Sequence, residues 1–169
     1  MKKAFVKGKK GFSIIEVLVA AGVFAILGIL STSAILISLK GSKKSESQLK
    51  VRDNLNYVLG IMERQIRNAK SITCSGSGKN LDYVDADGKL GAFAWDGVSN
   101  VTWKRPGEIV ASVLTSTDVK VETGTSITCD VSKIPPSVSI TLKGRDPDAA
   151  SDDEGAQVTI STKVQLRNY

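Results

Sequence analysis

The fold is decided by the stretch Lys9-Lys10-Gly11-Phe12-Ser13-Ile14-Ile15-Glu16-Val17-Leu18-Val19-Ala20, where a basic leader meets a long apolar run. Residues 17–39 carry no charge, and a helix of that length spans about 34 Å, enough to cross the hydrocarbon core of a membrane. A cleaved signal peptide or a simple anchor is the alternative. The run is longer than the apolar region of about 7–15 residues in a signal peptide, and residues 32–34 are a poor cleavage site. The sequence therefore predicts a membrane helix.

The basic character of the chain is concentrated in the leader. The net charge is +6 and the pI is about 9.3. Without the leader, 18 basic residues face 17 acidic ones, which leaves about +1. The charge therefore indicates a targeting segment rather than a nucleic-acid partner. The leader lysines are Lys2, Lys3, Lys7, Lys9 and Lys10.

Histidine is absent, which removes Ser-His and Cys-His nucleophile pairs, histidine-ligated zinc and imidazole bases together. The two cysteines, Cys74 and Cys129, show no CxxC or Cys/His spacing, so a zinc site is not expected. No catalytic residue and no resident cofactor are predicted, and the chain is not expected to be an enzyme.

A second helical pattern follows the apolar run over residues 40–70. Apolar side chains recur at spacings of three and four, with charged residues largely between them, which indicates one amphipathic face. We expect one helix from about Phe12 to about Lys70, with a bend or fraying near Gly41 and Ser42. Two separate helices joined by a Ser/Lys linker are the alternative. The predicted buried face is Val51, Leu55, Val58, Met62, Ile66 and Ala69.

Short β-branched and aromatic runs separated by turn residues fill residues 71–169 and predict a β-rich head. A turn is expected at Asp85-Ala86-Asp87-Gly88, since Asp supports local backbone bonding and Gly tolerates positive φ. The predicted fold class is α+β, a long N-terminal helical spine, membrane-spanning in its first half, packed against a C-terminal antiparallel head. The predicted strands are 81–84, 90–95, 101–103, 109–114, 119–122, 127–131, 138–142 and 158–166.

The junction around Gly11 resembles the class III prepilin signal of type IV pilins and type II secretion pseudopilins. The matching features are the basic leader, a glycine, an aromatic residue and a glutamate, Glu16, early in an apolar segment. The resemblance implies that a prepilin peptidase cuts between Gly11 and Phe12 and methylates the new amine of Phe12. It divides the chain into a leader (1–11), a transmembrane assembly helix (12–39), its amphipathic continuation (40–70) and the head (71–169).

Glu16 is the residue that a simple anchor does not explain. A charged side chain costs roughly 2.5–3.5 kcal/mol at the centre of a bilayer and less near the interface, so it tends to face a partner. In the resembled family, that partner is the N-terminal amine of the neighbouring subunit. The alternative is an interfacial glutamate solvated by headgroups. Gly22, Ala25 and Gly28 offer a weak signal for close helix approach, and Ser33 stands where many pilins have a proline.

The resemblance also implies partners and a location. The partners are other pilin or pseudopilin subunits, the prepilin peptidase and an inner-membrane assembly platform. The protein would cross the cytoplasmic (inner) membrane once, export its C-terminal head, and enter a periplasmic or extracellular filament. The pattern that ends in Met62-Glu63-Arg64-Gln65-Ile66-Arg67-Asn68-Ala69 resembles the helix end of minor pilins and J-type minor pseudopilins. So does the closing strand Val164-Gln165-Leu166-Arg167-Asn168.

A DNA-binding or adhesive tip pilin is the alternative function. Trp95, Trp103, Lys104 and Arg105 form an aromatic and basic neighbourhood of the kind that stacks on single-stranded nucleic acid. Isolated tryptophans in strands are more commonly core residues, so a nucleic-acid partner is not the leading expectation.

The cysteines and the acidic clusters suggest a disulfide and a calcium site, respectively. A Cys74–Cys129 bridge would tie the head to the helix end and contribute roughly 4 kcal/mol through loop closure, with free thiols as the alternative. Carboxylates in loops are also possible calcium ligands, with solvated turns as the alternative. The better candidate comprises Asp146, Asp148, Asp152, Asp153 and Glu154, and the other comprises Asp82, Asp85 and Asp87.

Overall fold

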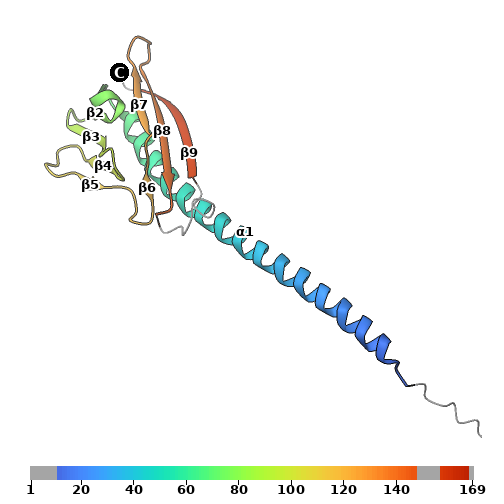
Figure 1. The fold of residues 1–169 in the computed structure, drawn as a ribbon. Coiled ribbons are helices and arrows are strands. Elements are labelled where there is room, and N and C mark those ends of the chain that lie inside the picture. Colours follow the sequence, from blue (N-terminus) through green and yellow to red (C-terminus); the bar gives the residue numbers. More distant parts are fainter. Residues whose placement is uncertain (1–10, 148–156, 168–169) are drawn as a thin grey trace, which may run out of the picture. The chain divides into compact units, whose positions relative to one another are not determined.

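The computed structural model describes residues 11–147 and 157–167, and it divides the chain into two compact units, Met1–Gly41 and Ser42–Tyr169. A single helix, α1 (Ile14–Asn68), contributes to both units (Figure 1). The predicted helix of residues 12–70 is therefore confirmed to within two residues at each end. The helix continues through Gly41 and Ser42, where the sequence suggested a bend, and the boundary between the units falls at these residues.

In the first unit, α1 exposes its apolar side chains. Phe24 is 74% exposed, Ile29 68% and Ile37 72%. Two of the three consecutive hydroxyl residues at 31–33 bond to the helix itself, because Thr32 donates to the Gly28 carbonyl and Ser33 to the Ile29 carbonyl, both at 2.9 Å. Each of these two bonds lets a polar side chain lie in an apolar environment with its donor paired. This part of α1 is long and apolar enough to cross a membrane.

In the second unit, α1 has one buried face. All six apolar residues predicted for that face are buried, and Leu59, which follows Val58, joins them at 7% exposure. Arg52, Asp53 and Arg64, on the remaining surface, are exposed. The spacing of three and four in the sequence therefore identified the buried side of this helix correctly.

Sheet A is an antiparallel meander of five strands, each paired with the next in the chain. Its first strand was missed by the sequence prediction, since Ser71-Ile72-Thr73-Cys74-Ser75 contains a single strongly apolar residue, Ile72. Pairing with the next strand gives this segment its extended form. The strands are β1 (Ser71–Ser75), β2 (Asn80–Val84), β3 (Leu90–Trp95), β4 (Val101–Lys104) and β5 (Ser112–Val113), with a short 3-10 helix, η1 (Gly76–Gly78), between the first two.

Sheet B is built around the strand β8 (Ser137–Arg145). The strand β9 (Gln157–Gln165) pairs with β8 along its whole length (Figure 1), and β6 (Lys120–Val121) and β7 (Ser126–Asp130) pair with the opposite edge of β8. All of these pairings are antiparallel, as predicted.

The helix and both sheets share one hydrophobic core. Gly144 on β8 shows how closely they approach, because a Cβ there would lie 3.3 Å from both the Leu55 and Val119 side chains. One predicted strand is largely wrong. Of residues 109–114, only Ser112–Val113 is a strand, and Ile109 and Val110 are 91% and 76% exposed in the loop before it. The α+β class is confirmed, with the second half of α1 in the core of an antiparallel head.

Candidate functional site

Gly11, Phe12 and Ser13 precede the first residue of α1. A Cβ at Gly11 would meet no atom within 4 Å, so nothing in the described fold requires glycine there. Phe12 is 82% exposed. The carbonyl of Ser13 accepts the first helical hydrogen bonds, from the backbone N–H groups of Glu16 at 3.0 Å and Val17 at 3.2 Å. A glycine without a packing role, next to an exposed aromatic residue, is accessible to an enzyme.

Glu16 lies in the first turn of α1 and is exposed. An acidic side chain is favourable at this end of a helix, where unpaired N–H groups give a partial positive charge. Among the described residues, no lysine or arginine forms an ion pair with its carboxylate. The helix end thus favours Glu16, and no described cation neutralises its carboxylate.

The apolar surface around Glu16 is large and continuous along the first unit. Besides the three residues given above, Ile14 is 82% exposed and Leu18 is 66% exposed. Exposed apolar patches of this extent mark contacts with a membrane or with other proteins. Gly22 and Gly28 have open space where a Cβ would be, so no described residue packs closely against them.

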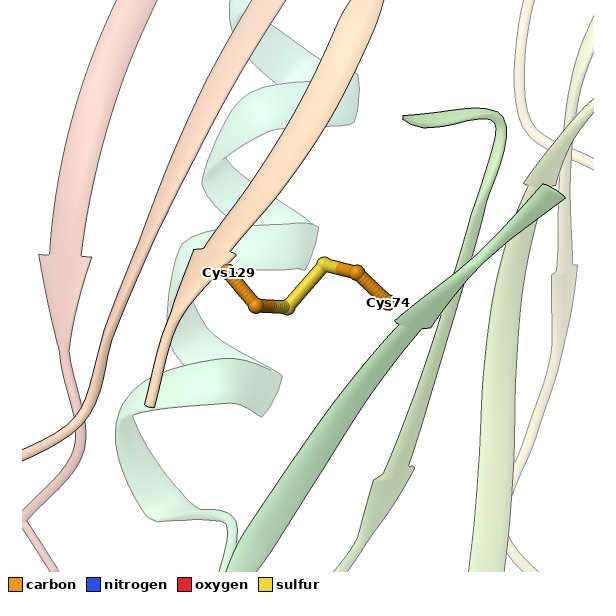
Figure 2. Close-up of a disulfide and its surroundings, with 2 residues drawn as sticks. All are labelled: Cys74 and Cys129. Carbon is orange, nitrogen blue, oxygen red and sulfur yellow. A yellow bond between two sulfur atoms is a disulfide. The ribbon is translucent and has the colours of Figure 1, made fainter. Parts of the chain in front are cut away.

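A disulfide joins Cys74 and Cys129, whose Cα atoms are 5.7 Å apart (Figure 2). Cys74 is in β1 and Cys129 is in β7, so the bridge joins sheet A to sheet B. The sequence suggested a bridge from the head to the end of the helix. The structure differs because the unpredicted strand β1 places Cys74 within the head.

The four residues considered for nucleic-acid binding do not form an open stacking platform. Trp95 is 7% exposed, with the Lys79 ammonium 5.5 Å above its ring. Trp103 is half-buried and stacks on Phe93 at 5.8 Å, while the Arg105 guanidinium lies 5.0 Å from its ring centre. Both indoles are therefore engaged by other groups of the head.

The two acidic clusters lie only partly within the described residues. The carboxylate of Asp85 accepts the backbone N–H groups of Asp87 at 2.9 Å and Lys89 at 2.8 Å, which shapes the predicted turn between β2 and β3. Asp146 is described, whereas Asp148, Asp152, Asp153 and Glu154 lie outside the described residues. Within the described part of the chain, no three His, Cys, Asp or Glu side chains gather as metal ligands would. Calcium binding stays a prediction.

One charged cluster was missed by the sequence analysis. Arg67 near the end of α1 and Lys163 and Arg167 near the end of β9 line a common cleft. The alternation of Lys163, Gln165 and Arg167 places them on one side of an extended segment and was the available signal. Arg67 is 96 positions before Lys163 in the sequence, so only the tertiary structure brings it to the same place.

Comparison with known proteins adds one match. Residues 6–35 match the family model described as the prokaryotic N-terminal methylation motif. No curated protein and no solved structure matches the chain. The matched segment contains Gly11, Phe12, Glu16 and most of the exposed apolar run.

Proposed function

Since the chain carries the prepilin-type N-terminal methylation motif and the long apolar helix of the type IV pilin-like family, we propose that it is a structural subunit of a type IV pilus or a type II secretion pseudopilus. The observation that carries this proposal is the location of Glu16. Its carboxylate has no ion pair among the described residues and lies at the start of an exposed apolar helix, four positions after a residue that would become the N-terminus.

In the proposed maturation, a prepilin peptidase cuts between Gly11 and Phe12, and the new amine of Phe12 is methylated. Cleavage removes the five leader lysines and creates a positive amine beside the first turn of α1. The precursor and the mature subunit rest in the cytoplasmic membrane through the first unit, and the second unit is exported as the head. A disulfide in the head fits an oxidising compartment.

In the proposed assembly, the carboxylate of Glu16 meets the amine of a neighbouring subunit as the apolar helix leaves the lipid. An opposite charge satisfies a group that is costly to bury alone. The exposed side chains of the first unit would then pack against equivalent helices. Contacts of this head-to-tail kind do not close and therefore build a helical fibre. The role is structural, with no chemistry carried out by the chain.

Within this family, we favour a minor subunit, with a location at the filament tip as one form of it. Support comes from the resemblance of residues 62–69 to the helix end of minor pilins and of J-type minor pseudopilins. Measuring the molar ratio of this chain to the most abundant subunit in purified filaments would test the assignment. A ratio near one would contradict it.

The proposal is tested by the substitution Glu16→Ala in the full chain, with Glu46→Ala as the matched control. Glu46 is also an exposed glutamate on α1 but lies in the second unit. We expect Glu16→Ala to be cleaved, inserted and folded as the parent is, because alanine is a good helix former, yet to be missing from sheared filaments. Glu46→Ala should assemble.

N-terminal mass spectrometry of the same samples supplies a second readout. The mature chain should begin at methylated Phe12, and replacing Gly11 with tryptophan should leave the uncut precursor in the membrane. Equal entry of the Glu16→Ala variant and the parent into filaments would contradict the role of Glu16. A mature start at any other residue would contradict the maturation.

A further inference from the structure

The strand β9 is the end strand of sheet B, since among the described strands it pairs with β8 alone (Figure 1). The pairing runs without a bulge from Gln157 to Gln165, so its other edge is about 26 Å long at about 3.3 Å per residue. Proteins commonly protect such an edge with proline, a bulge or several charges, because unpaired backbone groups are a template for another strand. The strand β9 has no proline and one charged residue, Lys163.

Every second residue of β9 points its backbone groups away from β8. Opposite residues of an antiparallel pair alternate between exchanging hydrogen bonds and directing their N–H and C=O groups outward. Leu166 lies opposite Pro136 and donates to its carbonyl at 3.1 Å, so the even-numbered residues of β9 bond to β8. The odd-numbered residues therefore face outward, and their backbone groups form no hydrogen bond with a described residue. They are Gln157, Thr159, Ser161, Lys163 and Gln165.

The helix α1 flanks this outer edge and leaves a hollow at each end of it. One hollow of about 260 Å³ lies between residues of α1 that include Arg52 and the start of β9 at Gln157. The other, of about 420 Å³, lies between Arg67 and the end of β9 at Lys163. Beyond it the backbone N–H of Arg167 donates to the Arg67 carbonyl at 3.0 Å, which joins the two elements. We call the space between α1 and the outer edge of β9, with these two hollows, the edge groove.

Gly60 lies on the side of α1 that lines the edge groove. It follows Arg52 by eight residues and precedes Arg67 by seven, which is about two helical turns in each direction. With Arg67 it lines a third hollow. A Cβ at Gly60 would meet no atom within 4 Å, and glycine destabilises the interior of a helix relative to alanine. Packing among the described residues thus does not require this glycine, whereas the close approach of another chain would.

The edge groove is positively charged. Its end hollows are lined by Arg52, Arg67, Lys163 and Arg167, and none of these side chains forms an ion pair in the described part of the chain. Glu63, which lines the third hollow, already accepts a hydrogen bond at 2.6 Å from a hydroxyl of β9. The forked donors of arginine match carboxylates well, so the charges suit an acidic partner.

We propose that an extended acidic segment of a different subunit of the filament adds to β9 as a further strand in the edge groove. The outward N–H and C=O groups supply the main-chain hydrogen bonds of strand addition, and the cations fix acidic side chains. A phosphate backbone carries acceptors only and would leave the carbonyl groups of the edge unpaired, whereas a peptide pairs both kinds of group. A minor subunit is surrounded by other subunits, so the choice of donor rests on the proposed function.

The experiment uses the full chain in its native membrane, with a photo-crosslinking amino acid at the exposed position 165, which lines the larger hollow. We expect crosslinks to another filament subunit, which peptide mass spectrometry should assign to one segment with at least two acidic residues. The position of Asp82, exposed on sheet A, is the control site for the photo-crosslinking amino acid and should not give this product.

The backbone is tested by Ser161→Pro, which removes one outward N–H from the middle of the edge. Proline is tolerated on an edge strand where its N–H is not needed, so the head should keep its disulfide and its tryptophan fluorescence. The crosslink yield should fall at least about tenfold, because the ladder to the added strand is interrupted. Ser161→Ala keeps the N–H and is the matched control, which should crosslink as the parent does.

The helix side of the groove is tested by Gly60→Leu, which is independent of the folding of β9. Leucine is a good helix former, so the variant should fold, but its side chain should fill the groove and lower the yield. Gly60→Ala adds only a Cβ, for which there is space, and should retain the crosslink.

The charges are tested by Lys163→Glu/Arg167→Glu, which should lower the yield at least about tenfold because reversed charges repel an acidic segment. Lys89→Glu/Lys104→Glu makes the same change in charge on sheet A and should leave the yield unchanged. Rising salt should weaken the contact, because exposed charges are screened.

Crosslinks only within the chain, only to a second copy of it, or only to lipid or nucleic acid would each overturn this inference. An unchanged yield in Ser161→Pro or Gly60→Leu would do so as well, as would equal losses in a variant and its matched control. N-terminal mass spectrometry on the same membranes separates it from the proposed function. A chain that begins at Phe12 but gives no such crosslink contradicts only the strand addition, whereas a chain that begins elsewhere contradicts the maturation.

Discussion

The described parts of the two units use the same kinds of side chain in opposite ways. In residues 11–41, large apolar residues such as Leu27 and Phe24 are 52% and 74% exposed, whereas in the second unit Leu55 and Phe93 are fully buried. The head satisfies its apolar surface within one chain. The described part of the first unit does not, and its apolar surface is available to a membrane or to other proteins. Apolar side chains therefore stabilise the fold of the head, whereas those of residues 11–41 remain exposed for contacts outside the chain.

The strongest test of this difference between the two units is to remove the disulfide. Cys74→Ser/Cys129→Ser should lower the free energy of unfolding of the head by about 4 kcal/mol, because the bridge closes a loop of 55 residues that restricts the unfolded chain. Both tryptophans lie in the second unit, so their fluorescence during denaturation in detergent micelles reports the head alone. The part of the helical circular dichroism that comes from residues 14–41 of α1 should persist after the head unfolds.

Reducing agent provides the control for this prediction. It should destabilise the parent to the level of the double serine variant and leave that variant unchanged. Complete loss of the helical signal in step with the fluorescence change, including the part from residues 14–41, would show that the two regions unfold as one and would contradict the comparison.

A matched pair of leucine truncations sharpens the comparison. Leu55→Ala should lower the free energy of unfolding of the head by about 3 kcal/mol, because it removes a fully buried side chain and leaves a cavity. Leu27→Ala removes the same atoms from an exposed position and should leave the unfolding midpoint of the head unchanged. Tryptophan fluorescence on both variants makes the measurement. Equal destabilisation by the two would contradict the division.

A smaller effect is expected from the contact between α1 and β9 in the head. Thr162→Val removes the hydroxyl that donates to the Glu63 carboxylate, and should lower the free energy of unfolding by about 1.5 kcal/mol because the acceptor is charged. Thr159→Val, at an exposed position on the same strand, is the control and should have little effect. A shift of the same size in both variants would point to strand propensity rather than to the hydrogen bond.

The smallest effect concerns pH. Hydrogen bonds from Lys133 and Ser132 lower the pKa of Asp130 from 3.8 to about 2 in the folded head. A depressed folded pKa means that the stabilisation is complete above pH 3.8 and is lost as the pH falls toward about 2. Asp130→Asn should remove this part of the acid sensitivity, measured as the change in the unfolding midpoint across that window. Lys133→Met should reduce the acid sensitivity as well. An unchanged acid response in both variants would contradict the role of Asp130.

The local pattern of apolar residues predicted most of the helices and strands. The predicted bounds of α1 and of the strand β3 agree with the structure. The buried face of α1 agrees as well, since an apolar period of 3.6 in a helix or 2 in a strand indicates which side of the element is buried. The strand β1 was missed because its extended form depends on pairing with β2, and residues 109–111 were overpredicted because β-branched residues also occur in exposed loops. The conformation of neither segment is decided by the strand propensity of its residues alone.

The sequence by itself determined the features that act over a few neighbouring residues: the methylation motif, the glutamate at the start of the apolar run, and a stretch long enough to cross a membrane. Only the tertiary structure decided the features that join distant residues. It placed Cys74 and Cys129 on different sheets and brought Arg67 to Lys163 and Arg167. The reason is physical, because the period of a helix or strand is set by the backbone, whereas contacts between elements depend on how a shared core packs.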